Sequence, residues 1–153
     1  MEARALATLL AITAAVAGAV RLTAPDVGDD LRAQATAAAL EAQMAWLFTD
    51  PEGRSHARDN TMPRVALCVA SEVPLDFAAL AQALAGSGLR PVPSAQCDEN
   101  GDVASALTVV GVRCPTSARC LVDIDGDLEG GSYEVRRSAG GWAVTANSIR
   151  WIA

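Results

Sequence analysis

The sequence contains no lysine and only one histidine, His56, and aromatic residues make up 4% of the chain. All twelve basic residues are therefore arginine, against eighteen acidic residues, and the net charge is −6. A negative chain repels the phosphates of nucleic acid, and the only adjacent basic pair is Arg136-Arg137. This composition excludes sequence-independent binding to nucleic acid. The absence of lysine, with abundant alanine and arginine, is typical of a GC-rich bacterial genome.

Residue patterns for the common catalytic mechanisms are also missing. The sequence has no Cys-x-x-Cys motif for thiol exchange and no Gly-x-Ser-x-Gly turn for a nucleophilic serine. His56 lies in the polar segment 50–64, where a solvated histidine is the expected interpretation. A segment of this length without helix or strand is either functional or merely mobile. We therefore predict no catalytic residue, no cofactor-binding residue and no cofactor.

The N-terminal segment indicates export. Residues 5–20 form a run of sixteen uncharged residues, which is shorter than the roughly 20 residues of a membrane-spanning helix. The run ends in Ala17-Gly18-Ala19, with the small residues that signal peptidase requires. We expect a cleaved signal peptide at 1–19, a tether at 20–28 and a single domain at 29–153, located in the periplasm or secreted, with no membrane span after cleavage. An uncleaved anchor or a buried helix is the alternative interpretation of this run.

Four cysteines in a small exported chain favour two disulfides, for which three pairings are formally available. The segment 113–120, RCPTSARC, lacks the spacing of a phosphatase loop and the close cysteine pairs of a structural zinc site. A Cys114–Cys120 disulfide instead closes a hairpin, because opposed Cα atoms in antiparallel strands lie within disulfide reach. In that register the apolar residues share one face, with Val112 opposite Val122 and Val110 opposite Ile124. The remaining pair is Cys68–Cys97.

Two helices are predicted in the first half of the chain. The first begins at Asp29 or Asp30, either of which can cap it, and ends near Phe48, ahead of Asp50-Pro51. Its apolar residues recur at helical spacing and are interpreted as core: Ala33, Ala37, Leu40, Met44 and Leu47. The second helix covers 77–85, after a buried strand at 65–70, with Asp76 as its cap and Gly86 as a left-handed stop.

The remaining segments are predicted to be strands. Residues 89–97 are extended and lie at an edge, because they contain Pro91 and Pro93, and a turn follows at 98–102. Four antiparallel strands complete the chain: 105–114, 119–126, 132–137 and 141–153. The last two pair in the register Arg137–Trp142, Val135–Val144 and Tyr133–Ala146. The apolar residues change from even to odd positions after Ala146, which requires a bulge or a break near Asn147-Ser148. The fold class is α+β, with two main helices packed on a mainly antiparallel sheet of about five to six strands.

The segment 123–127, DIDGD, imitates a calcium-binding loop. Asp123, Asp125 and Asp127 occupy its ligand positions 1, 3 and 5, and Glu134 occupies position 12. The glycine, however, stands at position 4 rather than 6, and the flanking segments are strands rather than helices. The favoured interpretation is an alternating strand with solvated carboxylates near the arginines of neighbouring strands, Arg136 and Arg150. We therefore predict no metal site.

The C-terminal segments SYEVRR, GGWAV and RWI, within 132–152, resemble the final hairpin of small bacterial envelope proteins of unassigned function. They are also similar to the last strands of nuclear transport factor 2-like (NTF2-like) cone folds. The second resemblance implies helices packed on a curved sheet, with a pocket for a small apolar ligand.

Two functions follow as expectations. The first is a non-catalytic exported binding or accessory protein that contacts an envelope partner through its sheet edge or through the 50–64 segment. The alternative is a small-molecule-binding protein of NTF2-like type, with or without acid/base catalysis by a carboxylate. An enclosed apolar cavity that holds a carboxylate favours the pocket, whereas a filled core with an open apolar patch favours the partner surface.

Overall fold

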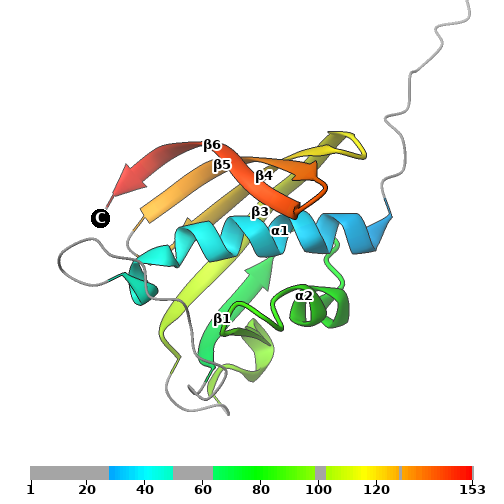
Figure 1. Ribbon diagram of the computed structural model, residues 1–153. Helices are drawn as coiled ribbons and strands as arrows, with labels where there is room; N and C mark the ends of the chain where they lie inside the picture. Colours follow the sequence, from blue (N-terminus) through cyan, green and yellow to red (C-terminus); the bar gives the residue numbers. More distant parts are fainter. Residues whose placement is uncertain (1–27, 50–63, 99–102, 128, 153) are drawn as a thin grey trace, which may run out of the picture.

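The computed structural model describes residues 28–49, 64–98, 103–127 and 129–152. Two helices lie on one face of a six-stranded sheet (Figure 1), which confirms the predicted α+β class. The signal peptide, nearly all of the tether, His56 with the rest of segment 50–63, and the turn residues 99–102 lie outside the described residues.

The sheet has the strand order β2-β1-β3-β4-β5-β6. The strand β1 (Val65–Ser71) lies between β2 (Leu89–Pro93) and β3 (Ser105–Thr116) and is parallel to both. The other strands follow as antiparallel neighbours: β4 (Arg119–Gly126), β5 (Glu129–Ser138) and β6 (Gly141–Ile152). Parallel pairing of β1 and β2 depends on the connection through α2 (Phe77–Ala83), because a tight turn joins only antiparallel strands. The two edges of the sheet are β2 and β6.

The helix α1 (Asp29–Gln43) is rich in alanine and packs both on the sheet and against α2. Most of the predicted stripe is buried, and several residues outside it are buried as well: Ala35, Thr36, Ala39 and Gln43. Small side chains let the neighbouring elements approach closely, so the buried surface is wider than one stripe. Leu47 is only partly buried, because the regular helix ends at Gln43 and the chain continues as a 3₁₀ turn, η1 (Ala45–Phe48).

The start of α1 differs from the prediction. Gly28 is the N-cap residue, and no side chain caps the helix. Asp29 and Asp30 stand inside the first turn, where their charges still face the positive end of the helix dipole. The carboxylate of Asp30 accepts a hydrogen bond from Nε2 of Gln34 at 2.8 Å instead of capping the backbone.

The start of α2 agrees with the prediction, but its end does not. Oδ1 of Asp76 accepts hydrogen bonds from the backbone N–H groups of Ala78 and Ala79 at 2.9 and 3.0 Å. Gly86 does not adopt a left-handed conformation; Gly88 does, with φ of 79°. The chain makes two further turns after the helix and needs the permissive backbone of glycine only where it enters β2.

The hydrophobic core lies between the helices and the sheet. Its largest fully buried side chains come from both helices and from β1 to β5: Leu40, Leu67, Leu80, Leu84, Leu89, Val109, Val122, Ile124 and Val135. The strand β6 contributes only the partly buried Trp142 and Val144. The contacts of β6 with the core are therefore confined to its first half.

The β3–β4 hairpin has the predicted pairing of Val112 with Val122, but Ile124 lies opposite Val109 and not Val110. A register shift between Val109 and Gly111 leaves Val110 in a bulge. Val109 and Val112 both belong to the core, and three residues apart they can share a face only if one extra residue interrupts the alternation. The sequence prediction assumed an unbroken strand here.

The β5–β6 hairpin confirms the pairs Arg137–Trp142 and Val135–Val144. Tyr133, however, lies opposite Asn147 rather than Ala146. Two register shifts replace the predicted single bulge at Asn147-Ser148, and the extra residues are Thr145 and Arg150. Each extra residue reverses the side-chain parity, so the apolar residues on either side of it fall on different faces.

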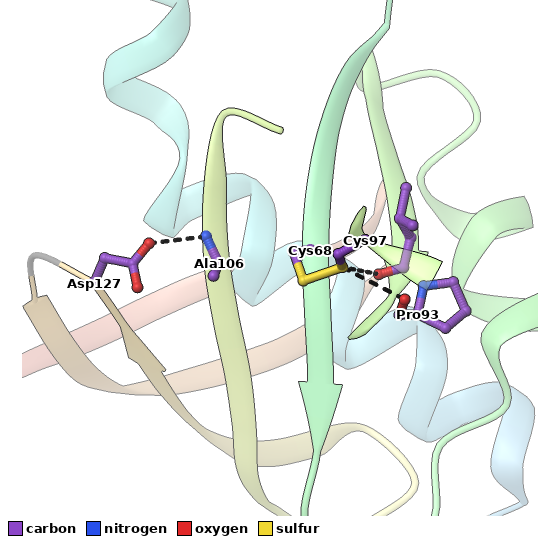
Figure 2. The surroundings of a disulfide bond; sticks show 6 residues. Cys68, Pro93, Cys97, Ala106 and Asp127 are labelled. Atoms are coloured by element: carbon purple, nitrogen blue, oxygen red, sulfur yellow. Dashed lines mark hydrogen bonds between the residues drawn. A yellow bond between two sulfur atoms is a disulfide. The ribbon is translucent and has the colours of Figure 1, made fainter. Parts of the chain in front are cut away.

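Both expected cysteine pairs are joined in the structure. Cys68 of β1 is bonded to Cys97, which follows the 3₁₀ turn η2 (Ser94–Gln96), with a Cα–Cα distance of 5.7 Å. Figure 2 shows this bond, with the Cys97 sulfur 3.4 Å from the carbonyl oxygen of Pro93. Cys114 and Cys120 join β3 to β4 next to the hairpin turn, and no cysteine is free. Two disulfides indicate an oxidising environment.

In the part of the chain that the structure describes, neither helix has the length and apolar character needed to span a membrane.

Replacing both Cys68 and Cys97 by alanine should destabilise the fold more than replacing both Cys114 and Cys120. The sequence separations are 29 and 6 residues, and the chain-entropy model then gives losses of about 3.6 and about 2.4 kcal/mol. Urea titrations followed by circular dichroism measure both free energies of unfolding. Equal losses, or a larger loss for the second pair, would contradict the dependence on loop length.

Candidate functional site

The four carboxylates of the calcium-like motif do not converge in the structure. Arg150 binds Asp125, and Ser132 donates a hydrogen bond to Asp123. Asp127, which directly follows β4, accepts a hydrogen bond from the backbone N–H of Ala106 on β3 at 3.1 Å (Figure 2). Among the described residues, no group of three or more potential ligands is placed to hold a metal ion.

Glu134 forms the most extensive ion pair on the solvent face of the sheet. Its two oxygens accept hydrogen bonds from Arg119 on β4 and Arg136 on β5, each at 2.7 Å. The hydrogen bond from Arg119, followed by that from Arg136, lowers the pKa of the Glu134 carboxyl. Glu134 is therefore held ionised by arginines on its own and the neighbouring strand, and it serves the sheet rather than a metal.

The second half of β6 carries the exposed large hydrophobic residues of the described chain. We call Ile149 and Ile152 the β6 patch; their exposed fractions are 59% and 71%, and that of Trp151 is 39%. Ile149 lies opposite Gly131 and Ile152 opposite Glu129, so both belong to the face of the sheet on which the helices pack. They stay exposed because no helix covers this end of β6.

Trp151 belongs to the opposite face, because the bulge at Arg150 reverses the parity. Its indole N–H donates to Oδ1 of Asp125 at 3.4 Å, and its ring lies over Gly130. A Cβ atom at Gly130 would overlap both the indole and the Asp125 carboxylate. The glycine therefore allows the tryptophan to lie flat across β5, which fixes the orientation of the end of β6.

A hollow of about 350 Å³ opens beside the β6 patch, at the end of the sheet where α1 stops. We call it the end hollow. Its lining combines apolar side chains with two carboxylates and comes from α1 and from strands β3 to β6: Gln43, Met44, Ser105, Leu107, Gly126, Asp127, Glu129 and Ile152. Figure 1 shows the last turn of α1 and the tip of β6 at the same end of the molecule.

A buried hydrogen-bond network forms the inner wall of the end hollow. The hydroxyl of Tyr133 donates to Oε1 of Gln43, and both side chains are only 5% exposed. Nε2 of Gln43 in turn donates to Oε1 of Glu129 at 3.2 Å. Burial, and secondly the negative charge of Glu129, raise the pKa of the Tyr133 hydroxyl, so that it stays a proton donor to Gln43.

A second hollow of about 460 Å³ lies between the two helices and the β5–β6 turn. Its lining is more polar: Asp30, Gln34, Ala37, Ala38, Glu41, Ala79, Gln82, Ala83, Gly141 and Trp142. The indole N–H of Trp142 donates to Gln34 at 3.2 Å, which joins the hairpin to α1. Partial loss of water around Glu41 raises the pKa of its carboxyl. Neither hollow is lined by a histidine or a cysteine.

Sequence reasoning did not identify the β6 patch or the end hollow. One signal was available, because Ile149 and Ile152 are three residues apart on a strand and cannot share a face without a bulge. The sequence prediction placed the bulge at Asn147-Ser148 and so did not identify the exposed pair. The hollow had no sequence signal, because its walls come from segments that are far apart along the chain.

No protein-family model matches this chain, and no curated protein or solved structure shows significant similarity to it. None of these comparisons supports the resemblance of the C-terminal hairpin to NTF2-like folds. The candidate site rests on the geometry of its own residues.

Replacing Tyr133 by phenylalanine should lower the free energy of unfolding by about 1–3 kcal/mol, because Oε1 of buried Gln43 loses its donor. The raised pKa of Tyr133 means that the fold favours the neutral hydroxyl. The stability that the neutral Tyr133 hydroxyl contributes is complete below its pKa in the unfolded chain, about 10. This stability is lost as pH rises through the pKa of the hydroxyl in the folded protein. Urea titrations at neutral pH and above about pH 10 measure the difference. A difference in the free energy of unfolding between the two proteins that grows as pH rises would contradict this prediction.

Proposed function

We propose that this chain is a non-catalytic binding or accessory protein of the periplasm or the extracellular space, and that it contacts a partner protein through the free edge of β6. The observation that carries the proposal is a strand of twelve residues whose outer edge pairs with no strand of the described residues, together with the exposed β6 patch at its end. An exposed strand edge offers a row of free backbone donors and acceptors to an incoming strand. Exposed apolar side chains beside that edge add the burial that makes such pairing specific.

The two edges of the sheet differ in how well they are protected. The edge strand β2 is only five residues long and contains Pro91 and Pro93, and the Cys68–Cys97 disulfide lies beside it. Proline removes backbone donors, which discourages pairing with another strand. The strand β6 contains no proline and a single charged residue, Arg150. The edge that is open to a partner is therefore β6.

The proposed location rests on the cysteines and on the N-terminal sequence. All four cysteines are in disulfides, as is usual for proteins outside the reducing cytoplasm. The signal peptide predicted at 1–19 would deliver the chain there.

A small-molecule pocket is the second candidate, and the end hollow is the observation that favours it. Its volume of about 350 Å³ and its mixture of apolar side chains with carboxylates fit a small ligand. Native mass spectrometry of the protein taken from its own envelope fraction separates the two functions. A retained partner adds the mass of a protein, whereas a pocket ligand adds only a few hundred daltons.

A photo-crosslinking amino acid placed at Ile149 should capture a discrete protein partner in cells. The same amino acid at Ala81, an exposed residue of α2, is the matched control and should capture none. Both positions are exposed, so the substitutions should change stability by no more than about 0.5 kcal/mol. Gel electrophoresis of the crosslinked products gives the result. Adducts of the same size and yield from both positions would contradict a role for the β6 edge.

A further inference from the structure

The end hollow reaches the free edge of the sheet. Ile152, the last described residue of β6, lines the hollow and is 71% exposed. Glu129, which lies opposite Ile152 on β5, lines it as well. A strand added to β6 would therefore place one of its side chains at the mouth of the hollow, next to Ile152.

The hollow is negatively charged as well as apolar. Asp127 and Glu129 line it, and neither forms an ion pair with an arginine of the described chain. Their hydrogen bonds come instead from the neutral donors Ala106 N–H and Gln43 Nε2. Two neighbouring carboxylates on the solvent face, Asp125 and Glu134, are already paired with arginines. Among the described residues at this end of the sheet, the carboxylates without an arginine partner thus line the hollow.

We propose that the partner bound at β6 supplies an extended segment in which two side chains face the same side as the end hollow. One is apolar and lies beside the β6 patch, and the other is a lysine or arginine that faces the hollow. The proposal rests on the proposed function, and it specifies the chemistry of the occupant. The apolar side chain packs on Ile149 and Ile152, while the basic group binds Glu129 and Asp127. Charge complementarity of this kind selects among partners and speeds their association.

The geometry of a sheet allows this contact. Neighbouring strands lie about 4.8 Å apart, so the backbone of an added strand would lie about 9.6 Å from β5. The side chains of an arginine or lysine and of a glutamate bridge this distance together. The basic side chain would pass over Ile152, with its methylene groups on the isoleucine and its charge at Glu129.

A second copy of this chain fits the hollow less well. Arg150 is the only charged residue of β6, and it is already bound to Asp125 and to the carbonyl oxygen of Ile124. A β6 strand from another copy would therefore bring no free cation to the carboxylates. The unpaired charge of the hollow favours a different, basic partner.

The test uses the full chain and two synthetic peptides that differ only in charge. The first is fluorescein-labelled Thr-Val-Thr-Lys-Thr-Val-Thr-Lys-Thr, whose valines and lysines share one face of an extended strand, and the second has glutamate in place of both lysines. Fluorescence anisotropy at low salt should show binding of the lysine peptide at least about tenfold tighter, which corresponds to about 1.4 kcal/mol. The difference should shrink at high salt, because screening weakens exposed charge pairs.

Two variants locate the effect. Asp127→Asn combined with Glu129→Gln keeps the shape and the hydrogen-bond acceptors of the hollow, and it should reduce the preference for lysine to below about threefold. The control, Asp29→Asn combined with Glu72→Gln, removes the same charge from exposed positions that do not line the hollow and should keep the preference. Thermal denaturation checks that both variants are folded.

The outcomes separate the inference from the function on which it rests. Equal binding of both peptides, or a preference that survives in the hollow variant, overturns the basic-partner inference. Ile149→Ser combined with Ile152→Ser should lower the affinity for both peptides, because the double variant removes apolar contact without changing charge. If that variant weakens both peptides while the lysine preference is absent, the edge function stands and the inference fails. Sedimentation that shows a dimer abolished by this variant would also overturn the inference, since a second copy would then occupy the edge.

Discussion

The hydrogen bond between Tyr133 and Gln43 connects the last turn of α1 to β5, the strand next to the β6 edge, and the candidate site depends on it. Both side chains are buried, and a buried amide or hydroxyl without a partner costs as much as several favourable contacts contribute. The side-chain oxygen of Gln43 accepts a hydrogen bond from Tyr133 and its nitrogen donates one to Glu129, so Gln43 must lie within reach of both residues. This requirement fixes where the helix ends on the sheet. The strands β5 and β6 continue beyond that point, and the uncovered remainder is the end hollow.

The charges of the sheet are arranged in two groups with different surroundings. On the solvent face, arginines on β4, β5 and β6 neutralise Asp125 and Glu134. At the end of the sheet, Asp127 and Glu129 accept hydrogen bonds only from neutral donors. The first group stabilises the strands on which it lies, whereas the second leaves negative charge available at an apolar surface. In a chain with a net charge of −6, arginines of the described residues therefore neutralise the first pair of carboxylates and not the second.

Those features that depend on neighbours in the sequence could be predicted. The capping role of Asp76, the pairing of Arg137 with Trp142 and the cysteine hairpin each follow from residues within a short segment. Errors arose where tertiary packing sets the parity of a strand. Val109 faces the core where Val110 was predicted, because the strand must also present Val112 inward. The bulges at Thr145 and Arg150 have a similar cause. The end hollow could not be predicted, since it depends on where α1 ends relative to strands formed by residues about ninety positions later.

The same arrangement suits the end hollow to the binding of a cation. Each of its two carboxylates accepts a hydrogen bond from an N–H donor, of Ala106 or of Gln43, and this bond holds the acceptor oxygen in position. A fixed acceptor is suited to hold a cation. The hollow also opens beside the outer edge of β6, so its carboxylates fit the basic segment that we propose to lie along this strand.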